Sequence, residues 1–247
     1  RLLAAAACKL CKSVAVGWSR VGSLIGHPKR PPMHVRCRWA ATRAGKITAV
    51  EAEVIADGGA YASTSQEVIK VAALFASGCY EVPNISVDGY AVYTNNIPCG
   101  AFRGFGAPQA QFASEIMVTR LAHALGLDPV ELRRRNIYRE GSIEPTQHPL
   151  PPGVSALPVL ERCVAEVESR KSIEDQGDRF GPYNPALSPH LRRGIGIACG
   201  IKNIGYSFGF PEQATATVEL HGGASIEHAH VRVGAAEVGQ GTHLILR

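Results

Sequence analysis

The chain has 247 residues, of which 45% are hydrophobic and 19% charged, and its formal net charge is +5. These proportions are ordinary for globular proteins, and the length suffices for one large domain or two small ones. The mild positive charge allows an anionic ligand, but no run of basic and aromatic residues supports a nucleic-acid-binding domain. No apolar run reaches the roughly 18 residues that cross a bilayer.

The cysteines do not form a disulfide framework, because there are seven of them and they are scattered along the chain. We therefore expect reduced thiols and a cytoplasmic location. The Cys8/Cys11 pair lacks the second pair that a zinc site requires. His228 and His230 would share one face of a strand, but no third ligand lies close in sequence, so we expect solvent-facing histidines and no metal site.

Hydrophobic periodicity predicts an α+β fold of mixed sheets with packed helices. An Ala-rich helix is expected up to about residue 12, followed by a strand at 13–18. Alternating residues at 33–39 and 47–56 predict the two strands of a long hairpin. A helix at 67–75 and a strand at 87–94 are expected next.

A longer helix is predicted over residues 108–125, with Pro108 in its first turn and Gly126 at its C-terminal cap. We interpret its apolar face as core; the residues on that face are Phe112, Ile116, Met117, Leu121, Ala124 and Leu125. A short helix ending near Asn136 should begin with a capping box of Asp128 and Glu131. The arginine run 133–135 and the cluster of Arg36, Arg38 and Arg43 are interpreted as solvated faces.

The remaining segments predict a second β-rich unit after a break. A helix is expected at 157–169, and residues 171–191 lack periodicity and are interpreted as a linker. Strands are expected at 194–199, 214–220 and 226–233. This pattern predicts two related lobes, with the break between about residues 140 and 192.

The most informative stretch, A-F-R-G-F-G-A-P-Q, occupies residues 101–109, between a predicted strand and a predicted helix. Its glycines permit positive φ angles and close approach of the backbone to a ligand. A loop that leads into a helix N-terminus also offers free N–H groups to an anion. From composition alone, a structural connector with two buried rings is the plainer interpretation. The stretch is neither a P-loop nor a dinucleotide-binding fingerprint.

The stretch resembles the A-F-R-G-F-G-x-P-Q signature of the aldehyde oxidase and xanthine dehydrogenase family of molybdenum hydroxylases. Other parts of the chain resemble further motifs of the same family. They are Y-T-N-N at 93–96, L-D-P-V-E-L-R-R-R-N at 127–136, G-Q-G-T at 239–242, D-G-G-A-Y at 57–61 and C-Y-E-V-P-N at 79–84. The resemblance covers nearly the whole chain.

The resemblance implies an internal fragment of the molybdopterin-binding subunit. Residues 1–140 would be the C-terminal part of a first molybdopterin-binding domain, 141–192 a helix and linker, and 193–247 the truncated start of a second domain. The implied cofactor is a molybdenum-pyranopterin, as molybdopterin or its cytosine dinucleotide. The [2Fe–2S] clusters and FAD would belong to other domains or subunits, in an assembled enzyme that is a dimer.

The resemblance also assigns roles to individual residues. Phe102 and Phe105 would flank a flat substrate, while Arg103 would brace the loop through charge-assisted hydrogen bonds. Cofactor-binding residues would be Ala101, Phe102, Arg103, Gly104, Gly239, Gln240 and Gly241.

The implied reaction is the oxidative hydroxylation of an aldehyde or N-heteroaromatic compound, with water as the oxygen source. The family's general-base glutamate is expected beyond Arg247, so we expect no catalytic residue here and no activity from the fragment alone. Glu115 and Glu131 have capping or surface explanations instead. An alternative is a non-catalytic remnant that keeps the fold but binds no cofactor. Because a purine-binding arginine of the xanthine dehydrogenases would fall at Val71, xanthine is expected to be a poor substrate.

Overall fold

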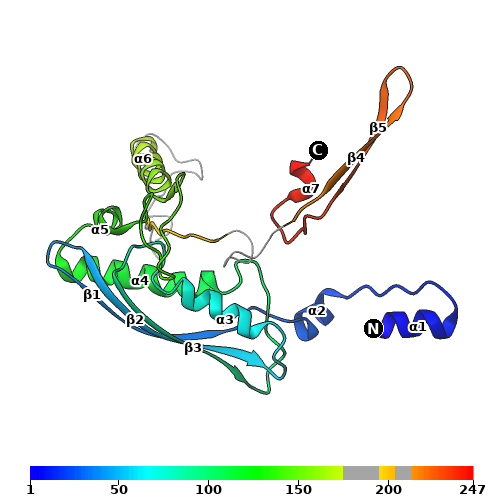
Figure 1. The fold of residues 1–247 in the computed structure, drawn as a ribbon, viewed down its shortest axis with the longest axis horizontal. Helices are drawn as coiled ribbons and strands as arrows, with labels where there is room; N and C mark the ends of the chain where they lie inside the picture. Colours follow the sequence, from blue (N-terminus) through cyan, green and yellow to red (C-terminus); the bar gives the residue numbers. More distant parts are fainter. Residues whose placement is uncertain (175–194, 204–212, 247) are drawn as a thin grey trace, which may run out of the picture. The chain divides into compact units, whose positions relative to one another are not determined.

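The computed structural model describes residues 1–174, 195–203 and 213–246, and the chain divides into two compact units, Arg1–Ile201 and Lys202–Arg247. Helices and mixed sheets make the fold α+β, as predicted. The first unit contains, in chain order (Figure 1), α1 (Leu2–Leu10), α2 (Arg20–Gly26), β1 (Met33–Ala41), β2 (Ile47–Gly59), α3 (Ser65–Leu74), β3 (Asn84–Tyr93), α4 (Ala107–Leu125), α5 (Pro129–Asn136) and α6 (Ala156–Glu174). The second contains β4 (Ala216–Gly222), β5 (Ile226–Val233) and α7 (Thr242–Ile245).

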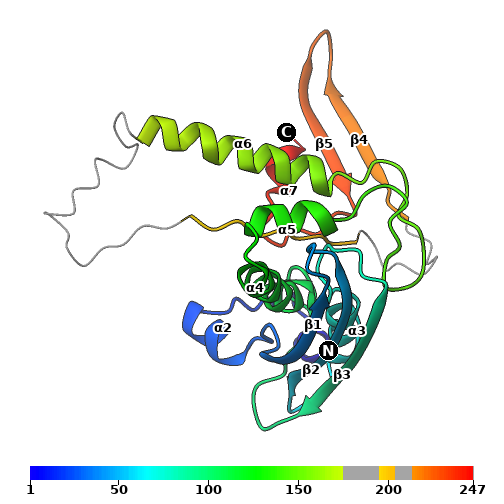
Figure 2. The same cartoon turned by 90° about the vertical axis from the view of Figure 1, so that its left-hand side faces the viewer.

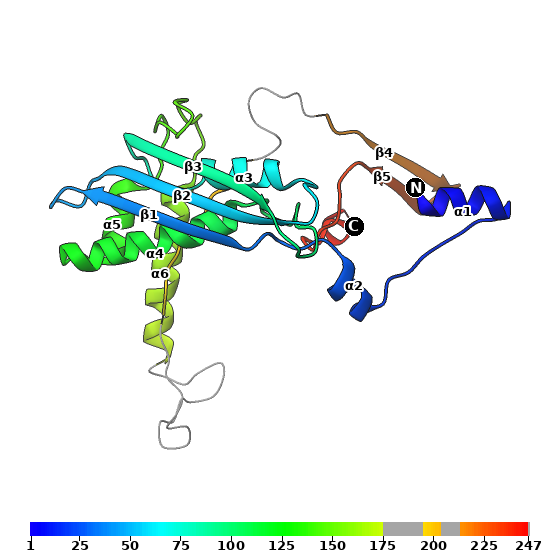
Figure 3. The ribbon, with the colours of Figure 1, turned by 90° about the horizontal axis from the view of Figure 1, so that it is seen from below.

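The sheet of the first unit has the order β1-β2-β3. β1 and β2 form the predicted antiparallel hairpin, whereas β2 and β3 run parallel, as Figure 3 shows from below. Parallel neighbours need a crossover connection, and α3 lies in that connection. Because β2 and β3 run parallel, they end at the same edge of the sheet. The end of β3, and the glycine-rich stretch after it, therefore lie close to the start of α3.

The two faces of this sheet have different surroundings. Helices α3 and α4 pack on one face (Figure 2), where Val54 and Ala56 of β2 are fully buried against α3 and α4 residues. On the other face, Arg36 pairs with Glu53 at 3.0 Å and Arg38 pairs with Glu51 at 2.6 Å. The solvated face predicted for these arginines is confirmed.

The predicted core face of α4 is only partly confirmed, because Leu121 and Leu125 pack against the core but the residues nearer the N-terminus of the helix do not. Phe112 is 70% exposed and Ile116 is 39% exposed. The buried side of this helix carries small and polar residues instead, namely Ala107, Ala110, Gln111, Ser114, Glu115, Val118 and Ala122. Periodicity assigns large apolar side chains to the core, but here small residues allow close packing and the buried polar groups have partners.

Residues 195–203 contain no strand, although a strand was predicted at 194–199; Gly194 lies outside the described residues. The backbone of this segment bonds to side chains of α4 rather than to a neighbouring strand. The Cys199 amide donates to the Glu115 carboxylate at 2.9 Å, and the Ile201 amide donates to Gln111 Oε1 at 3.0 Å. Alternating apolar residues still face the core, which explains why the sequence pattern is that of a strand.

Several other boundaries differ from the predictions. Residues 13–18 form no strand, and α6 extends to Glu174, into the predicted linker; residues 175–191 of that linker lie outside the described part. The strands predicted at 214–220 and 226–233 are confirmed as β4 and β5. Among the described residues, no helix is both long and apolar enough to cross a membrane.

Candidate functional site

The glycine-rich loop, residues 100–106, has a backbone path that only glycine can follow at two positions. Gly104, Phe105 and Gly106 have successive positive φ angles of 94°, 53° and 97°. A Cβ atom on Gly106 would clash with the Val68 carbonyl oxygen, and one on Gly104 would clash with the Pro108 ring. The three residues therefore turn the chain tightly into the N-terminus of α4.

Hydroxyl groups at the start of α3 hold the beginning of the glycine-rich loop. The Ala101 amide donates to Thr64 Oγ1 at 2.7 Å, and Ser65 Oγ donates to the Cys99 carbonyl at 2.9 Å. Ser65 is 2% exposed, so this second hydrogen bond is shielded from water. The loop is thus attached to the helix that connects β2 and β3.

Arg30 braces the far side of the loop. Its guanidinium carbon lies 4.7 Å from the centre of the Phe102 ring, its Nη1 donates to Gln109 Oε1 at 3.1 Å, and its Nη2 donates to the Arg103 carbonyl. Partial burial lowers the pKa of Arg30. The bracing role that the resemblance gives to Arg103 stays a prediction, and Arg30 is a further residue that braces the loop. Sequence reasoning missed it because no local motif marks a residue 73 positions away.

The loop presents unused hydrogen-bond donors. Within the described residues, the amide N–H groups of Phe102, Gly104 and Gly106 have no hydrogen-bond partner, and α4 begins without a side-chain cap. Free N–H groups at a helix N-terminus, beside a fixed arginine, favour a negatively charged, oxygen-rich ligand. This donor set fits the phosphate and pterin groups of a molybdenum-pyranopterin.

Two of the sequence motifs meet at the end of β2. The Asp57 carboxylate accepts hydrogen bonds from Thr94 Oγ1 at 2.6 Å, from the Gly59 amide at 2.9 Å and from the Asn96 side chain. These bonds lower the pKa of Asp57. They tie the end of β2 to the segment that follows β3. The Cys99 amide adds a hydrogen bond to the Gly58 carbonyl at 3.0 Å.

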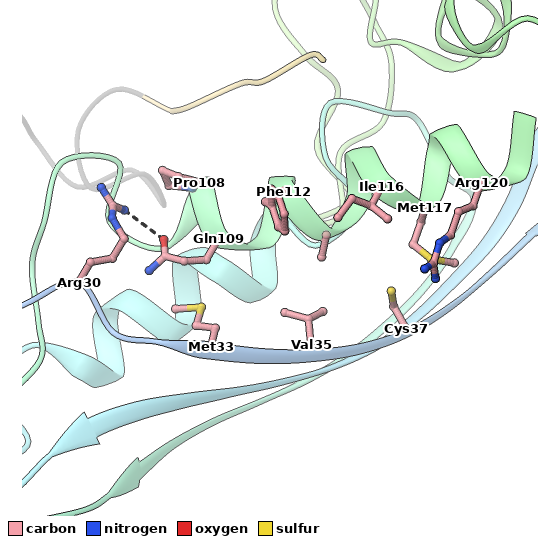
Figure 4. Close-up of a pocket in the computed structure, with 11 residues that line it drawn as sticks. Arg30, Met33, Val35, Cys37, Pro108, Gln109, Phe112, Ile116, Met117 and Arg120 are labelled. Atoms are coloured by element: carbon pink, nitrogen blue, oxygen red, sulfur yellow. Dashed lines mark hydrogen bonds between the residues drawn. The ribbon is translucent and has the colours of Figure 1, made fainter. Parts of the chain in front are cut away.

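An open groove runs from the loop along α4. Figure 4 shows Phe112, Ile116 and Met117 of α4 facing Met33 and Val35 of β1. The groove has a volume of about 640 Å³, within the range of small-molecule sites. Arg30 and Gln109 stand at its loop end, joined by the hydrogen bond described above.

The second predicted binding segment, residues 239–241, lies in the other unit and forms a turn of its own. Gly239 and Gly241 have φ angles of 98° and 81°. The Gln240 side-chain amide donates to the Ala236 carbonyl at 2.6 Å and to Thr242 Oγ1 at 2.7 Å. The amide predicted to hold the cofactor is therefore engaged inside its own loop.

Glu237, which sequence reasoning missed, organises the same turn. Its Oε1 accepts hydrogen bonds from the Gly239 amide at 2.6 Å and from the Gly241 amide at 3.2 Å, and its Oε2 accepts one from the Thr242 amide. A carboxylate just before a G-Q-G motif is the signal that could have identified it. It occupies amides that would otherwise be open to a ligand.

The explanation given for Glu115 is wrong, and so is the solvated face predicted for Arg133. Arg133 is 1% exposed and Glu115 is 8% exposed. They form a buried ion pair of 2.7 Å, and the Tyr80 hydroxyl also donates to the carboxylate. Periodicity could not reveal this pair, because its partners lie on different helices. The carboxylate is fully used by structural donors, which leaves it no role as a general base.

Comparison with known proteins identifies the family of this chain. The chain matches the molybdopterin cofactor-binding domain families over residues 1–137 and again over 170–247. It therefore belongs to the molybdopterin-binding domains of the molybdenum hydroxylase family.

Individual relatives cover different shares of the chain. It is 32% identical, over 95% of its length, to a probable xanthine dehydrogenase subunit of Bacillus subtilis. It is 42% identical, over 67% of its length, to the large molybdopterin subunit of a nicotinate dehydrogenase of Eubacterium barkeri. The solved aldehyde oxidoreductase of Desulfovibrio gigas superposes on 62% of the chain with a TM-score of 0.55 and 32% identity.

The chain spans only part of these relatives. It corresponds to 30% of the Bacillus protein, 38% of the Eubacterium protein and 17% of the Desulfovibrio chain.

Proposed function

We propose that this chain supplies part of the cofactor site of a larger molybdenum hydroxylase, which oxidises an aldehyde or an N-heteroaromatic compound. The observation that carries the proposal is the glycine-rich loop, whose free amides and arginine brace match an anionic cofactor. The relatives described as aldehyde oxidoreductase, nicotinate dehydrogenase and xanthine dehydrogenase support the substrate class.

The residues of this chain would bind and orient the cofactor. The amides of Phe102 and Gly104 would donate to the cofactor, and Ala101 and Arg103 of the same loop would also contact it. Arg30 would keep the loop in place through its bond to the Arg103 carbonyl. When bound, the molybdenum-pyranopterin supplies a hydroxylation in which water provides the oxygen and a hydride leaves the substrate carbon.

Phe102 is 54% exposed and Phe105 is partly buried, so their rings are available as walls for a planar substrate. Gly239, Gln240 and Gly241 of the second unit would also bind the cofactor. For Gln240 this requires its amide to exchange an internal partner for the cofactor.

We further propose that the complete enzyme contains [2Fe–2S] clusters and FAD on other domains or subunits, forms a dimer and works in the cytoplasm. The general-base glutamate would lie in a part of the enzyme beyond Arg247. The alternative function, a remnant of the fold without cofactor, predicts that the purified full-length protein contains no molybdenum.

The test is the molybdenum content of the purified full-length protein, measured by mass spectrometry. Arg30→Ala, Arg103→Ala and Gln240→Ala should each lower molybdenum occupancy, and Arg30→Lys should restore it only in part because lysine lacks the planar fork. Arg36→Ala, which removes an exposed arginine from the opposite sheet face, is the control. Full occupancy in all of the first three variants would refute the binding roles.

A further inference from the structure

One face of the hairpin β4–β5 gathers three histidines and a glutamate. The register of the two strands places Glu219 opposite His230 and His221 opposite His228. Side chains alternate along a strand, so residues two positions apart share a face. The four side chains thus form two adjacent cross-strand pairs on the same face.

Three of these side chains converge on one point. One ligand atom from each of Glu219, His221 and His230 lies within 4.8 Å of the other two, and His221 Nε2 is 4.0 Å from Glu219 Oε2. Ligand atoms around tetrahedral zinc, at bond lengths of about 2.1 Å, lie about 3.4 Å apart. Rotamer adjustments of roughly 1 Å would close the site, which is feasible because His221 and His230 are exposed.

The fourth side chain orients one of the ligands. The imidazole rings of His221 and His228 are stacked, with centroids 4.5 Å apart and an interplanar angle of 10°. This stacking limits the rotation of the His221 ring and keeps it over the strand pair. A ring held in place by a neighbour loses less conformational entropy when it binds a ligand.

We propose that Glu219, His221 and His230 bind a divalent transition-metal ion, with His228 as the positioning residue for His221. A set of two imidazoles and one carboxylate binds zinc, iron(II), nickel and copper in preference to magnesium or calcium. The sequence alone did not predict this metal site, because no third ligand lies close to His228 and His230 along the chain. The hairpin register supplies Glu219 and His221 from the other strand.

Arg232 is a cation next to the proposed metal site. It lies two residues beyond His230, and its guanidinium forms an ion pair with Glu219. This cation competes with a metal ion for the same carboxylate, and it also repels a nearby positive ion. Removing it should therefore strengthen metal binding, whereas removing a ligand should weaken binding.

The experiment is a calorimetric titration of Zn²⁺ into the full-length protein after treatment with a chelator. His221→Ala, His230→Ala and Glu219→Gln should each weaken Zn²⁺ binding about tenfold or more, since even outer-shell partners contribute about 10–100-fold. Two variants should bind like the wild type. Glu227→Gln removes a carboxylate of β5 that lies outside the ligand cluster, and His34→Ala removes an exposed histidine from β1.

Three results distinguish a specific metal-binding site from adventitious binding. Arg232→Ala should bind Zn²⁺ more tightly, and weaker binding would overturn Glu219 as a ligand. Co²⁺ should give the visible absorption of a low-symmetry nitrogen and oxygen site, and His230→Ala should abolish it. Unchanged Zn²⁺ affinity in both histidine variants would overturn the proposal. Molybdenum content, measured in parallel, should stay at the wild-type level and shows that each variant is folded.

Discussion

Removing one partner of the buried ion pair between Glu115 of α4 and Arg133 of α5 is predicted to destabilise the first unit strongly. Arg133 Nη2 and Nε donate to Glu115 Oε2 at 2.7 and 3.0 Å. The same carboxylate accepts the Cys199 amide and the Tyr80 hydroxyl. Burial alone would lower the pKa of Arg133, but Tyr80 and Glu115 outweigh it, so the pKa lies above its ordinary value.

The loss of stability follows from the buried polar groups that a substitution leaves without a partner. Glu115→Leu would strand a guanidinium that is 1% exposed, together with the Cys199 amide. Breaking a buried ion pair in this way costs about 3–5 kcal/mol, a large part of the roughly 5–15 kcal/mol that stabilises a typical protein. At about 2–4 °C per kcal/mol for a folded unit of about 200 residues, such as Arg1–Ile201, the Tm of the transition that unfolds this unit should fall by about 6–20 °C.

The assay is differential scanning calorimetry of the full-length protein, with Arg36→Ala as the matched control. Arg36 pairs with Glu53 on the exposed sheet face, where such pairs contribute about 0–1 kcal/mol. The double variant Glu115→Leu, Arg133→Met should recover much of the lost stability, because it leaves no unpaired charge. If Glu115→Leu lowers Tm no more than Arg36→Ala does, the reasoning is refuted.

The other predictions concern the loop support, the substrate and the chain's organisation. The pKa of Asp57 is lowered, so its stabilising contribution is complete above about pH 4 and is lost as the pH falls further. Asp57→Asn should flatten the acid side of the stability curve measured in urea, and an unchanged curve would contradict this. Gly106→Ala should lower both molybdenum content and stability, the latter by more than the roughly 1–2 kcal/mol expected for Gly126→Ala, whose Cβ would meet no atom within 4 Å; equal effects would argue against a tight loop. In steady-state kinetics of the full-length enzyme, kcat/KM should be lower for xanthine than for benzaldehyde, and the reverse order would show that Val71 was misassigned. Limited proteolysis should cut first between about residues 140 and 192, whereas a first cut within 87–126 would contradict the two-lobe assignment.

Strong local patterns predicted most of the elements around the site. The alternation at 33–39 and 47–56 gave the hairpin, because each strand has one helix-covered face and one solvated face. Asp128 caps α5 as expected, since its Oδ1 accepts the Val130 and Glu131 amides at 2.9 Å. Glu131, the other half of the predicted capping box, instead pairs with Arg135 at 2.8 Å.

The candidate site was predicted less completely than the elements. The motif at 101–109 located the glycine-rich loop, because backbone conformation at Gly104 and Gly106 depends on local residue type. Arg30 was missed, because its contacts join segments more than 70 positions apart. Periodicity assigns Phe112, Ile116 and Met117 of α4 to the core, but these residues line an open groove. Leu121 and Leu125 of the same face do pack against the core.

The sequence by itself determined the elements with strong periodicity, the turn chemistry and the membership in a family, since these depend on neighbouring residues and on motif spacing. Only the tertiary structure decided which polar groups are buried together. Glu115 and Arg133 are residue types that also form surface pairs, and their burial depends on how α4, α5 and the 195–201 segment pack. The proposed metal ligands on β4 and β5 became a cluster only through strand register, because cross-strand neighbours are set by pairing and not by order along the chain.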